Sequence, residues 1–369
     1  MPAKTVSSLD PRAELNEQFK VQADNEDLSR VGTKNVQVFA DAIWDMVAEA
    51  TRKPDTTEMR IRNVASSGKA PARSVLECVG PDKPFLVDSL LNVASALGLE
   101  VLALFHPILT LGPEKRLSVI QIHLPRLSKG EAAALEEETQ RALDDIALAV
   151  DDYQAMRSAM VDEIDRLQAQ KHLPEDFISE SSAFLTWLAT EHFVFLGKRT
   201  YEFPRNTAGE IIAEEPDMVE GSNLGLLRDE RLNVLNRSSE PTVLTPEIGA
   251  FVGRREPIII AKSTMVSRVH RRVAADYVGI KHYDDDGRVC GETRFLGLFT
   301  SEAYDETTRS IPLVRKRVEK IIENTGARPG SHDAKSLANI LEQWPRDELL
   351  QSTAEILTPM ARGALHLIG

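Results

Sequence analysis

The sequence predicts an α+β protein that contains a ferredoxin-like βαββαβ unit, a long connecting helix, a second domain of antiparallel strands and a helical end. Three observations predict this fold class. Patterns typical of a strand, a helix, two strands and a helix follow one another between residues 59 and 150. Apolar residues then recur at helical spacing as far as about Gln170. Strand-like runs follow, and helical spacing returns after Pro312.

The N-terminal part is expected to be a polar, loosely ordered tail over residues 1–32 and then one helix from Asn35 to about Thr51. Two strand-like runs follow, MRIRNV and RSVLECV, and the turn-like stretch SSGKAPA separates them. Residues 1–58 are therefore assigned to a tail and a helix outside the ferredoxin-like unit.

The middle of the ferredoxin-like unit is a helix between two strand regions. Leu86 and Leu97 bound a helical apolar face, and Gly98 supplies a stop. EVLALFHPILTL and LSVIQIHL are predicted strands, with Pro107 marking an edge or a bulge. The strand that completes the unit is either the run near Met59 or a strand from another chain.

The same patterns divide the rest of the chain. The helix that begins at Glu131 is expected to break near Asp151 and Asp152. The fold of residues 204–250 is not predicted. The apolar end, GALHLIG, is typical of a fragment of a longer protein. The predicted parts are 59–150 for the ferredoxin-like domain, 151–178 for the connecting helix, 179–305 for the second domain and 306–369 for the helical segment.

Composition excludes several classes of protein. The 369 residues carry a formal net charge of -13, which argues against nucleic acid or an anionic membrane as the main partner. No run of 18 apolar residues is found, so no membrane span is expected. The two cysteines, Cys78 and Cys290, are interpreted as buried free thiols of a reducing cytoplasm, with a disulfide as the alternative.

No catalytic or metal-binding motif is found. The sequence lacks G-x-G-x-x-G after a strand, G-x-x-x-x-G-K-[ST], H-E-x-x-H, C-x-x-C and G-x-S-x-G. Asp284, Asp285 and Asp286 precede Gly287 too closely for a calcium loop and predict a hairpin turn. Ser331 is expected to cap a helix. No catalytic residue, metal or cofactor is therefore assigned to this chain.

A basic run stands out in the acidic chain. It is interpreted either as a site for a phosphate or an acidic partner, or as a solvated or intersubunit ion-pair surface. The residues of the run are Arg254, Arg255, Arg268, His270, Arg271 and Arg272.

The turn in VGPDKPFLVDSLLNVASALGLEVL is the best candidate for a ligand site. Asp82 can cap the helix by accepting backbone N–H bonds, and Pro84 pre-sets the first turn. Free N–H groups at a helix start also suit the carboxylate of an amino acid, whose ammonium group an Asp could take. An ordinary capped helix with solvated side chains is the alternative. The candidate ligand-binding residues are Asp82, Lys83, Phe85, Asp88, Ser89 and Asn92.

Residues 73–99 resemble the ACT domain, a small regulatory fold that binds amino acids. The turn of that family commonly reads D-[RK]-P-G, and Phe85 stands here where the family has Gly. Over about residues 35–369 the chain resembles the N-terminal region of the large bacterial NAD-specific glutamate dehydrogenases. Six motifs carry this resemblance: PFLVDS, HFVFLG, DYVGIK, GETRFLGLFTSEAY, IPLVRKRVEKII and GSHDAKSLANILEQWPRDEL.

The resemblance implies an ACT-like regulatory domain over residues 59–150 and a PAS-like domain over 179–305. It also implies that the catalytic residues and the NAD site lie elsewhere in the same polypeptide, in a cytoplasmic homo-oligomer. Three hypotheses for this chain stay open: a domain that senses a small molecule such as an amino acid, a scaffold that binds no ligand, and a self-standing enzyme. The sensor predicts a pocket beside Asp82 and Asp88, and the scaffold predicts an empty turn.

Overall fold

The computed structural model describes residues 10–23, 25–31, 35–53, 56–66, 71–111, 115–205, 216–232 and 256–368. Within these ranges the chain forms a mixed structure of helices and two antiparallel sheets. It divides into two compact units. Unit 1 comprises residues 1–150 together with 267–272, and unit 2 comprises residues 151–266 and 273–369.

The sheet of unit 1 has the strand order β1-β2-β5-β3, with β4 also paired to β5. Its strands are β1 (Glu58–Val64), β2 (Arg73–Pro81), β3 (Ala103–Phe105), β4 (Ile108–Thr110) and β5 (Arg116–Pro125). The run near Met59 pairs antiparallel with β2, from Glu58 opposite Val79 to Val64 opposite Arg73. The place left open in the predicted unit is therefore filled by this chain itself. The predicted strand EVLALFHPILTL is divided at Pro107 into β3 and β4.

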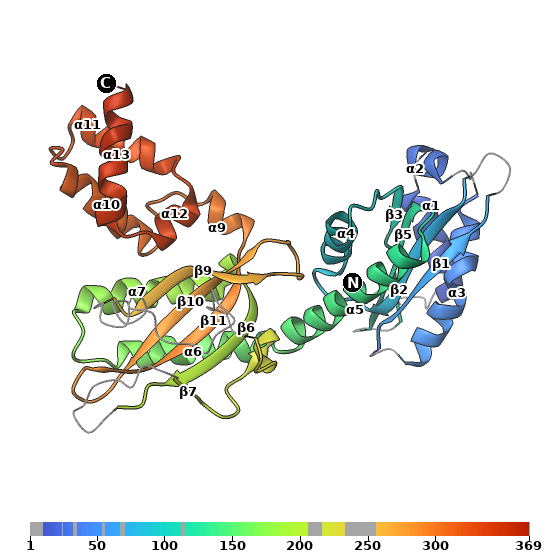
Figure 1. Cartoon of the computed structure of the whole chain (residues 1–369), viewed down its shortest axis with the longest axis horizontal. Helices are drawn as coiled ribbons and strands as arrows, with labels where there is room; N and C mark the ends of the chain where they lie inside the picture. The colour runs from blue at the N-terminus through green and yellow to red at the C-terminus, as the bar shows by residue number, and fades with distance from the viewer. Residues whose placement is uncertain are drawn as a thin grey trace, which may run out of the picture. The chain divides into compact units, whose positions relative to one another are not determined.

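Helices cover both faces of this sheet. Figure 1 shows α4 (Leu86–Ala96) and α5 (Lys129–Asp151) on one side, and α1 (Pro11–Gln22) and α3 (Gln37–Arg52) on the other. The short helix α2 (Asn25–Arg30) lies between α1 and α3 in the chain. Because side chains of a strand alternate between faces, two covered faces explain why β2 is buried at every position except Pro81.

The expectation of a loosely ordered tail over residues 1–32 is wrong for the described part of that stretch. Leu15 and Phe19 of α1 are fully buried and belong to the same apolar cluster as Phe39 of α3 and Phe105 of β3. The rings of Phe19 and Phe105 lie 5.7 Å apart. These two buried residues of α1 are four positions apart. Two apolar positions are too few to form a helical pattern that could be recognised in the sequence.

The sheet of unit 2 has the order β7-β6-β11-β10-β9, with β8 also paired to β6. Its strands are β6 (Phe193–Glu202), β7 (Asp217–Met218), β8 (Leu224–Gly225), β9 (Ile258–Val266), β10 (Ala274–Tyr283) and β11 (Val289–Phe299). The Asp284–Asp286 stretch forms the turn between β10 and β11, as predicted. Beyond the helix break at Asp152, α6 (Tyr153–Gln168) and α7 (Glu175–Trp187) pack on one face of this sheet.

The C-terminal helices share the apolar core of unit 2. They are α9 (Ser301–Asp305), α10 (Val314–Thr325), α11 (His332–Glu342), α12 (Arg346–Gln351) and α13 (Ala354–Ile368). Ile321, Leu337 and Leu357 are fully buried in the cluster that also contains Phe195 of β6 and Phe295 of β11. Ser331 caps α11 by accepting the N–H of Ala334 at 3.2 Å, as predicted.

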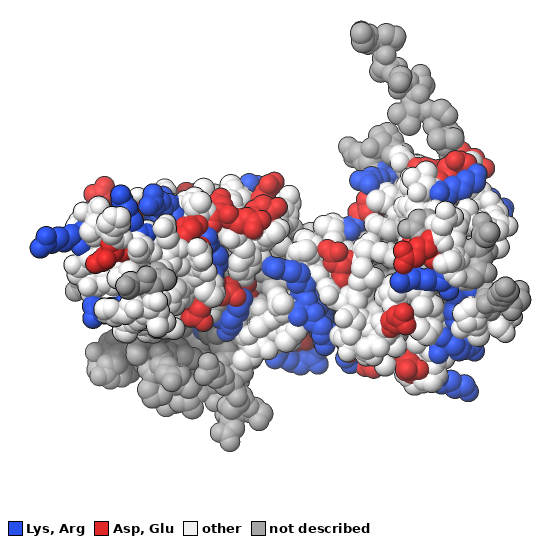
Figure 2. All heavy atoms as spheres, turned by 90° about the horizontal axis from the view of Figure 1, so that it is seen from above, with Lys and Arg blue, Asp and Glu red and all other residues white. Residues whose placement is uncertain are grey.

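On one face of the molecule (Figure 2), charge of both signs is spread over both units. On the face shown in Figure 2, Lys and Arg residues are interspersed with Asp and Glu residues. Among the described residues, no helix is both long and apolar enough to cross a membrane.

Candidate functional site

The turn before α4 is built differently from the sequence expectation. Asp82 does not cap the helix, because its carboxylate faces Arg116 at 3.2 Å and its N–H donates to the Arg116 carbonyl at 3.1 Å. The residue in the N-cap position is Phe85, which has no capping side chain. Asp82 therefore connects the turn to β5 and does not cap α4. The prediction that Asp82 caps this helix is wrong.

Phe85 is held in a left-handed backbone conformation, with φ of 71°. A residue with a Cβ atom is disfavoured there, and such strain in proteins tends to gather at functional sites. His270 has φ of 64° and is a second non-glycine residue of this kind among the described residues. The two rings lie 5.3 Å apart. Two strained residues from distant parts of the chain thus meet at this turn.

Residues 267–272 bring His270 onto the first two turns of α4. The main-chain N–H of His270 donates to Ser89 Oγ at 3.0 Å. The main-chain carbonyl of His270 accepts from Asn92 Nδ2 at 2.6 Å. Ser89 is fully buried, and its own hydroxyl donates to the Phe85 carbonyl at 2.6 Å. The hydrogen bonds of both side chains are therefore committed within unit 1.

Charged contacts hold the same segment. His270 Nδ1 lies 3.1 Å from the Asp88 carboxylate. Arg268 lies 3.2 Å from Asp145 and 3.7 Å from Glu138, both on α5. Burial raises the pKa of Asp145, and the Arg268 guanidinium acts against this by favouring the charged carboxylate. Within the basic run, Arg268 thus forms ion pairs within the chain, and His270 contacts the Asp88 carboxylate. Arg254 and Arg255 lie outside the described residues.

Four of the six predicted ligand residues converge on one partner. Phe85, Asp88, Ser89 and Asn92 all contact His270, whereas Asp82 faces Arg116 and Lys83 lies in the turn between them. Sequence reasoning missed His270 as the partner. The available signal was the basic run, but nothing in its local pattern connects it to a helix that lies almost 180 residues earlier.

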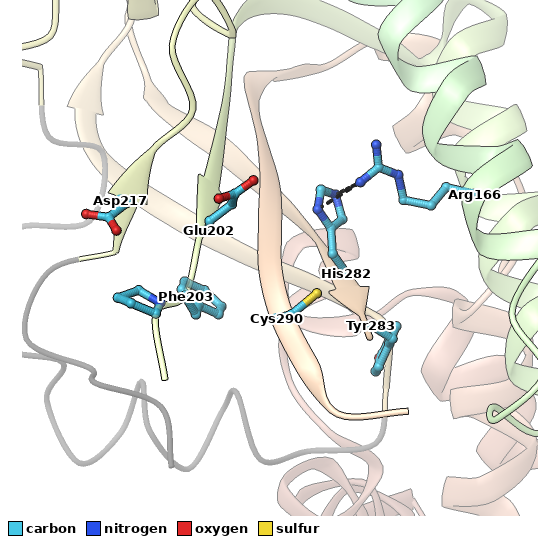
Figure 3. Close-up of a pocket in the computed structure, with 8 residues that line it drawn as sticks. Arg166, Glu202, Phe203, Asp217, His282, Tyr283 and Cys290 are labelled. Carbon is cyan, nitrogen blue, oxygen red and sulfur yellow. Dashed lines mark hydrogen bonds between the residues drawn. The ribbon is translucent and has the colours of Figure 1, made fainter. Parts of the chain in front are cut away.

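A second polar site lies at one end of the sheet of unit 2. A cavity of about 420 Å³ opens there, and Figure 3 shows the side chains around it. Its lining residues are Arg166, Glu202, Phe203, Pro204, Asp217, His282, Tyr283 and Cys290.

Two of the lining residues, Arg166 and His282, belong to a hydrogen-bonded cluster that continues to Glu163 and Thr293 behind them. Arg166 donates to His282 Nδ1 at 3.0 Å, so that nitrogen is an acceptor, because guanidinium groups only donate. His282 Nε2 then carries the hydrogen and donates to Glu163 at 3.0 Å. Burial alone would raise the pKa of Glu163, but hydrogen bonds from His282 and Thr293 lower it below its usual value.

The cluster has the residue types of a hydrolytic site but not the geometry. Thr293 is fully buried and donates to Glu163 at 2.7 Å, so its hydroxyl does not face the cavity as a nucleophile. Cys290 is half-buried and burial raises its pKa, which disfavours the reactive thiolate. Among the described residues, no group of three or more His, Cys, Asp or Glu side chains could hold a metal ion. The cavity therefore gives no support to a self-standing enzyme.

Comparison with known proteins points to one family. A family model described as "Glutamate dehydrogenase, ACT1 domain" matches residues 15–173. A second, described as "Glutamate dehydrogenase, helical motif 1", matches residues 311–368. The first match begins within α1, at residue 15, and includes α2 and α3, so most of the N-terminal helical region lies inside the matched domain.

Curated relatives agree with these matches. The chain is 30% identical over 350 residues to the NAD-specific glutamate dehydrogenase of Halomonas elongata. The aligned region covers 88% of this chain and 21% of that protein. The chain is 30% identical over 348 residues to the protein of the same name from Pseudomonas aeruginosa, with the same coverage. The chain is also 27% identical over 184 residues to the NAD-specific glutamate dehydrogenase of Mycobacterium tuberculosis. That aligned region covers 50% of this chain and 10% of that protein. The chain thus spans about a fifth of the length of the first two relatives.

Proposed function

The chain belongs to the NAD-specific glutamate dehydrogenase family, as part of its N-terminal region, and we propose that it is a non-catalytic regulatory and assembly segment of such an enzyme. In this proposal the full-length enzyme converts L-glutamate, NAD and water to 2-oxoglutarate, ammonium and NADH in the cytoplasm. NAD binds outside this chain, which is consistent with the absence of a dinucleotide fingerprint from the sequence.

Unit 1 is proposed to be an ACT-like domain of the ferredoxin-like class. Its elements β2, α4, β3, β5 and α5 follow one another in the order that this class requires, and β1 takes the place of the fourth strand. The antiparallel sheet of unit 2, with α6 and α7 on one face, supports the proposal of a PAS-like domain.

The observation that carries a regulatory role is the attachment of residues 267–272 to α4. The segment is held by the polar contacts of His270, whose backbone is strained, and by the ion pairs of Arg268 with α5. Peptide bonds join it to β9 and β10 of unit 2. A ligand that favours either the attached or the released segment would therefore shift an equilibrium in which both units take part. The proposed ligand is an amino acid at the predicted residues of the turn.

A scaffold without a ligand is the second candidate, and two observations favour it. The turn is occupied by the chain's own residues, and Phe85 replaces the glycine that lets a ligand approach the backbone. Both faces of the sheet in unit 1 are covered by helices, so a homo-oligomer that uses this sheet would have to pair through an edge such as β1.

A thermal-shift screen of the 369-residue chain against amino acids, 2-oxoglutarate and nucleotides separates the two candidates. A ligand at about 100 times its Kd adds roughly 2.7 kcal/mol of stability. We expect a saturable shift with an amino acid that is lost in Asp88→Asn and kept in Ser95→Ala, an exposed position on the same helix. Flat curves across the panel, with a dimer or larger species by light scattering, would leave only the scaffold. Formation of NADH from glutamate by this chain alone would overturn both.

A further inference from the structure

Helix α13 carries a row of apolar side chains on its outer face. Ile356, Met360 and Leu367 are 57%, 52% and 89% exposed. Among the described residues, nine large apolar side chains are more than a third exposed, and three of them lie in this row. Single exposed apolar residues are ordinary on a protein surface, whereas a continuous row of them marks an interaction surface.

The spacing of the row is that of a contact between two helices. With Gly363 included, positions 356, 360, 363 and 367 follow one another at intervals of four, three and four residues, as the a and d positions of a coiled coil do. These four residues are called the α13 seam below. The inner face of α13 is already packed against α10 and α11, with Leu357 and Ala361 fully buried. The seam is therefore a second apolar row, separate from the one that holds α13 in unit 2.

Gly363 forms a notch in the middle of the seam. A glycine inside a helix is destabilising relative to alanine, and a Cβ atom at this position would meet nothing within 4 Å. Gly363 is also not one of the glycines with positive φ. Neither the backbone nor the packing of the described residues thus requires glycine here. A notch of this kind suits the close approach of another backbone or of a large side chain, and the flexible thioether of Met360 beside it can adapt to a partner.

The size of the seam decides between two kinds of partner. A stable interface between separate proteins involves about 20–30 residues on each side, whereas the seam has four. A segment of the same polypeptide needs fewer contacts, because the covalent connection supplies it at an effective concentration on the order of millimolar. The first two relatives contain such polypeptide, since the aligned region is 21% of their length.

We propose that the α13 seam is the docking surface for an amphipathic helix of the same polypeptide that lies outside this chain. The docking helix carries its own apolar row at the same spacing, with one large side chain opposite Gly363. Because α13 shares its core with the sheet of unit 2, docking attaches unit 2 to the remainder of the enzyme. This inference rests on the proposal that the chain is a segment of a longer enzyme, and it adds the surface of attachment.

Thiol labelling tests whether the seam is covered. Met360→Cys places a reporter on the seam, and His366→Cys is a matched control at an exposed position of the same helix, away from the seam. Both are made in a Cys290→Ser background, and mass spectrometry reads the label at the substituted position. In the 369-residue chain the two variants should react at similar rates. In the full-length enzyme Met360→Cys should react at least tenfold more slowly, and His366→Cys should react as before.

Two results of this labelling would overturn the proposal. The first is equal labelling of Met360→Cys in the full-length enzyme and in the 369-residue chain. The second is slow labelling of Met360→Cys already in the 369-residue chain, together with a dimer in analytical ultracentrifugation, because the seam would then belong to a second copy of this chain.

Filling the notch tests the fit of the docking helix. Gly363→Leu points into open space in this chain, so the 369-residue variant should unfold in urea at an unchanged or higher midpoint. In the full-length enzyme, adding Gly363→Leu to Met360→Cys should raise the labelling rate at least tenfold. Ile356→Asp, at the other end of the seam, serves the same purpose if Gly363→Leu does not fold in the full-length enzyme. Labelling that stays slow in both variants would show that the seam does not bind the docking helix.

The labelling separates this inference from the regulatory function. If amino acids change the activity of the full-length enzyme but Met360→Cys labels equally in both proteins, the regulatory function stands and the docking surface is wrong. If Met360→Cys is protected in the full-length enzyme but its activity never responds to amino acids, the docking surface stands and the regulatory function is wrong.

Discussion

Protonation of His123 should make unit 1 lose stability as the pH falls below neutrality. The ring is fully buried on β5, where it meets the rings of Phe39 at 5.0 Å and Phe105 at 5.5 Å. Its Nδ1 accepts a hydrogen bond from Arg73 Nε at 3.3 Å. Burial, together with the positive charges of Arg73 and Arg62, lowers the pKa of His123 to about 3. The folded state therefore keeps this histidine neutral above about pH 3.

The size of the effect follows from proton linkage. An unfolded chain binds a proton at histidine below a pKa of about 6.5, whereas the folded chain does not bind it until about pH 3. The free energy of unfolding is therefore fully maintained above pH 6.5 and falls as the pH decreases from 6.5 towards 3. Each pH unit within this window costs about 1.4 kcal/mol. At pH 5 the loss due to His123 is about 2 kcal/mol relative to pH 7.

Urea unfolding at pH 7 and pH 5 measures this loss. Trp44 reports on unit 1 when Trp187 and Trp344 are both replaced by Phe, because these are the only other tryptophans. In that background His123→Gln keeps an acceptor for Arg73 but cannot titrate. The parent should lose about 2 kcal/mol more than the Gln variant between the two pH values. Equal pH dependence in the two proteins would show that His123 takes up its proton while folded, and the reasoning would be wrong.

Three further outcomes follow from local geometry. Phe85→Gly should be more stable than Phe85→Ala by about 1 kcal/mol in urea unfolding, because glycine adopts the left-handed conformation without strain. Equal stability of the two variants would show that the backbone at position 85 is not strained. A thiol reagent should modify Cys290 but not Cys78 in the folded chain, because Cys290 lines the cavity of unit 2 and Cys78 is buried with a pKa raised to about 12. Cys290→Ser should make the folded chain inert to the reagent, and modification of Cys78 in that variant would refute the burial of Cys78. Ser331→Ala should lower the stability of unit 2 by about 1 kcal/mol, because α11 loses its cap, and an unchanged midpoint would show that water replaces the hydroxyl.

Elements that depend on neighbouring residues were predictable from the sequence. The division of one strand at Pro107, the turn at Asp284–Asp286 and the cap at Ser331 all follow from conformational preferences of those residues. The pairing of the strand near Met59 with β2 could be proposed but not chosen, because strand pairing depends on partners that periodicity does not identify. α1 escaped prediction because its two buried residues, Leu15 and Phe19, are too few to produce a helical pattern.

The candidate site was predicted on its α4 side and missed on its other side. Asp88 and Asn92 could be found because helical periodicity places them off the apolar face of α4. Ser89 was expected to lie off that face as well, but it is fully buried. Their partner could not be found, because His270 carries no local mark of a binding residue and its left-handed backbone is a property that only glycine or asparagine would have signalled in the sequence. Phe85 hides the same feature. Phe85 stands where the family turn has a glycine, and its backbone is left-handed. Its ring contact with His270 is one interaction that can offset the strain. The departure from the family pattern at Phe85 and the occupation of the site by His270 are thus two sides of one arrangement, since a glycine at position 85 would leave the imidazole without its aromatic partner.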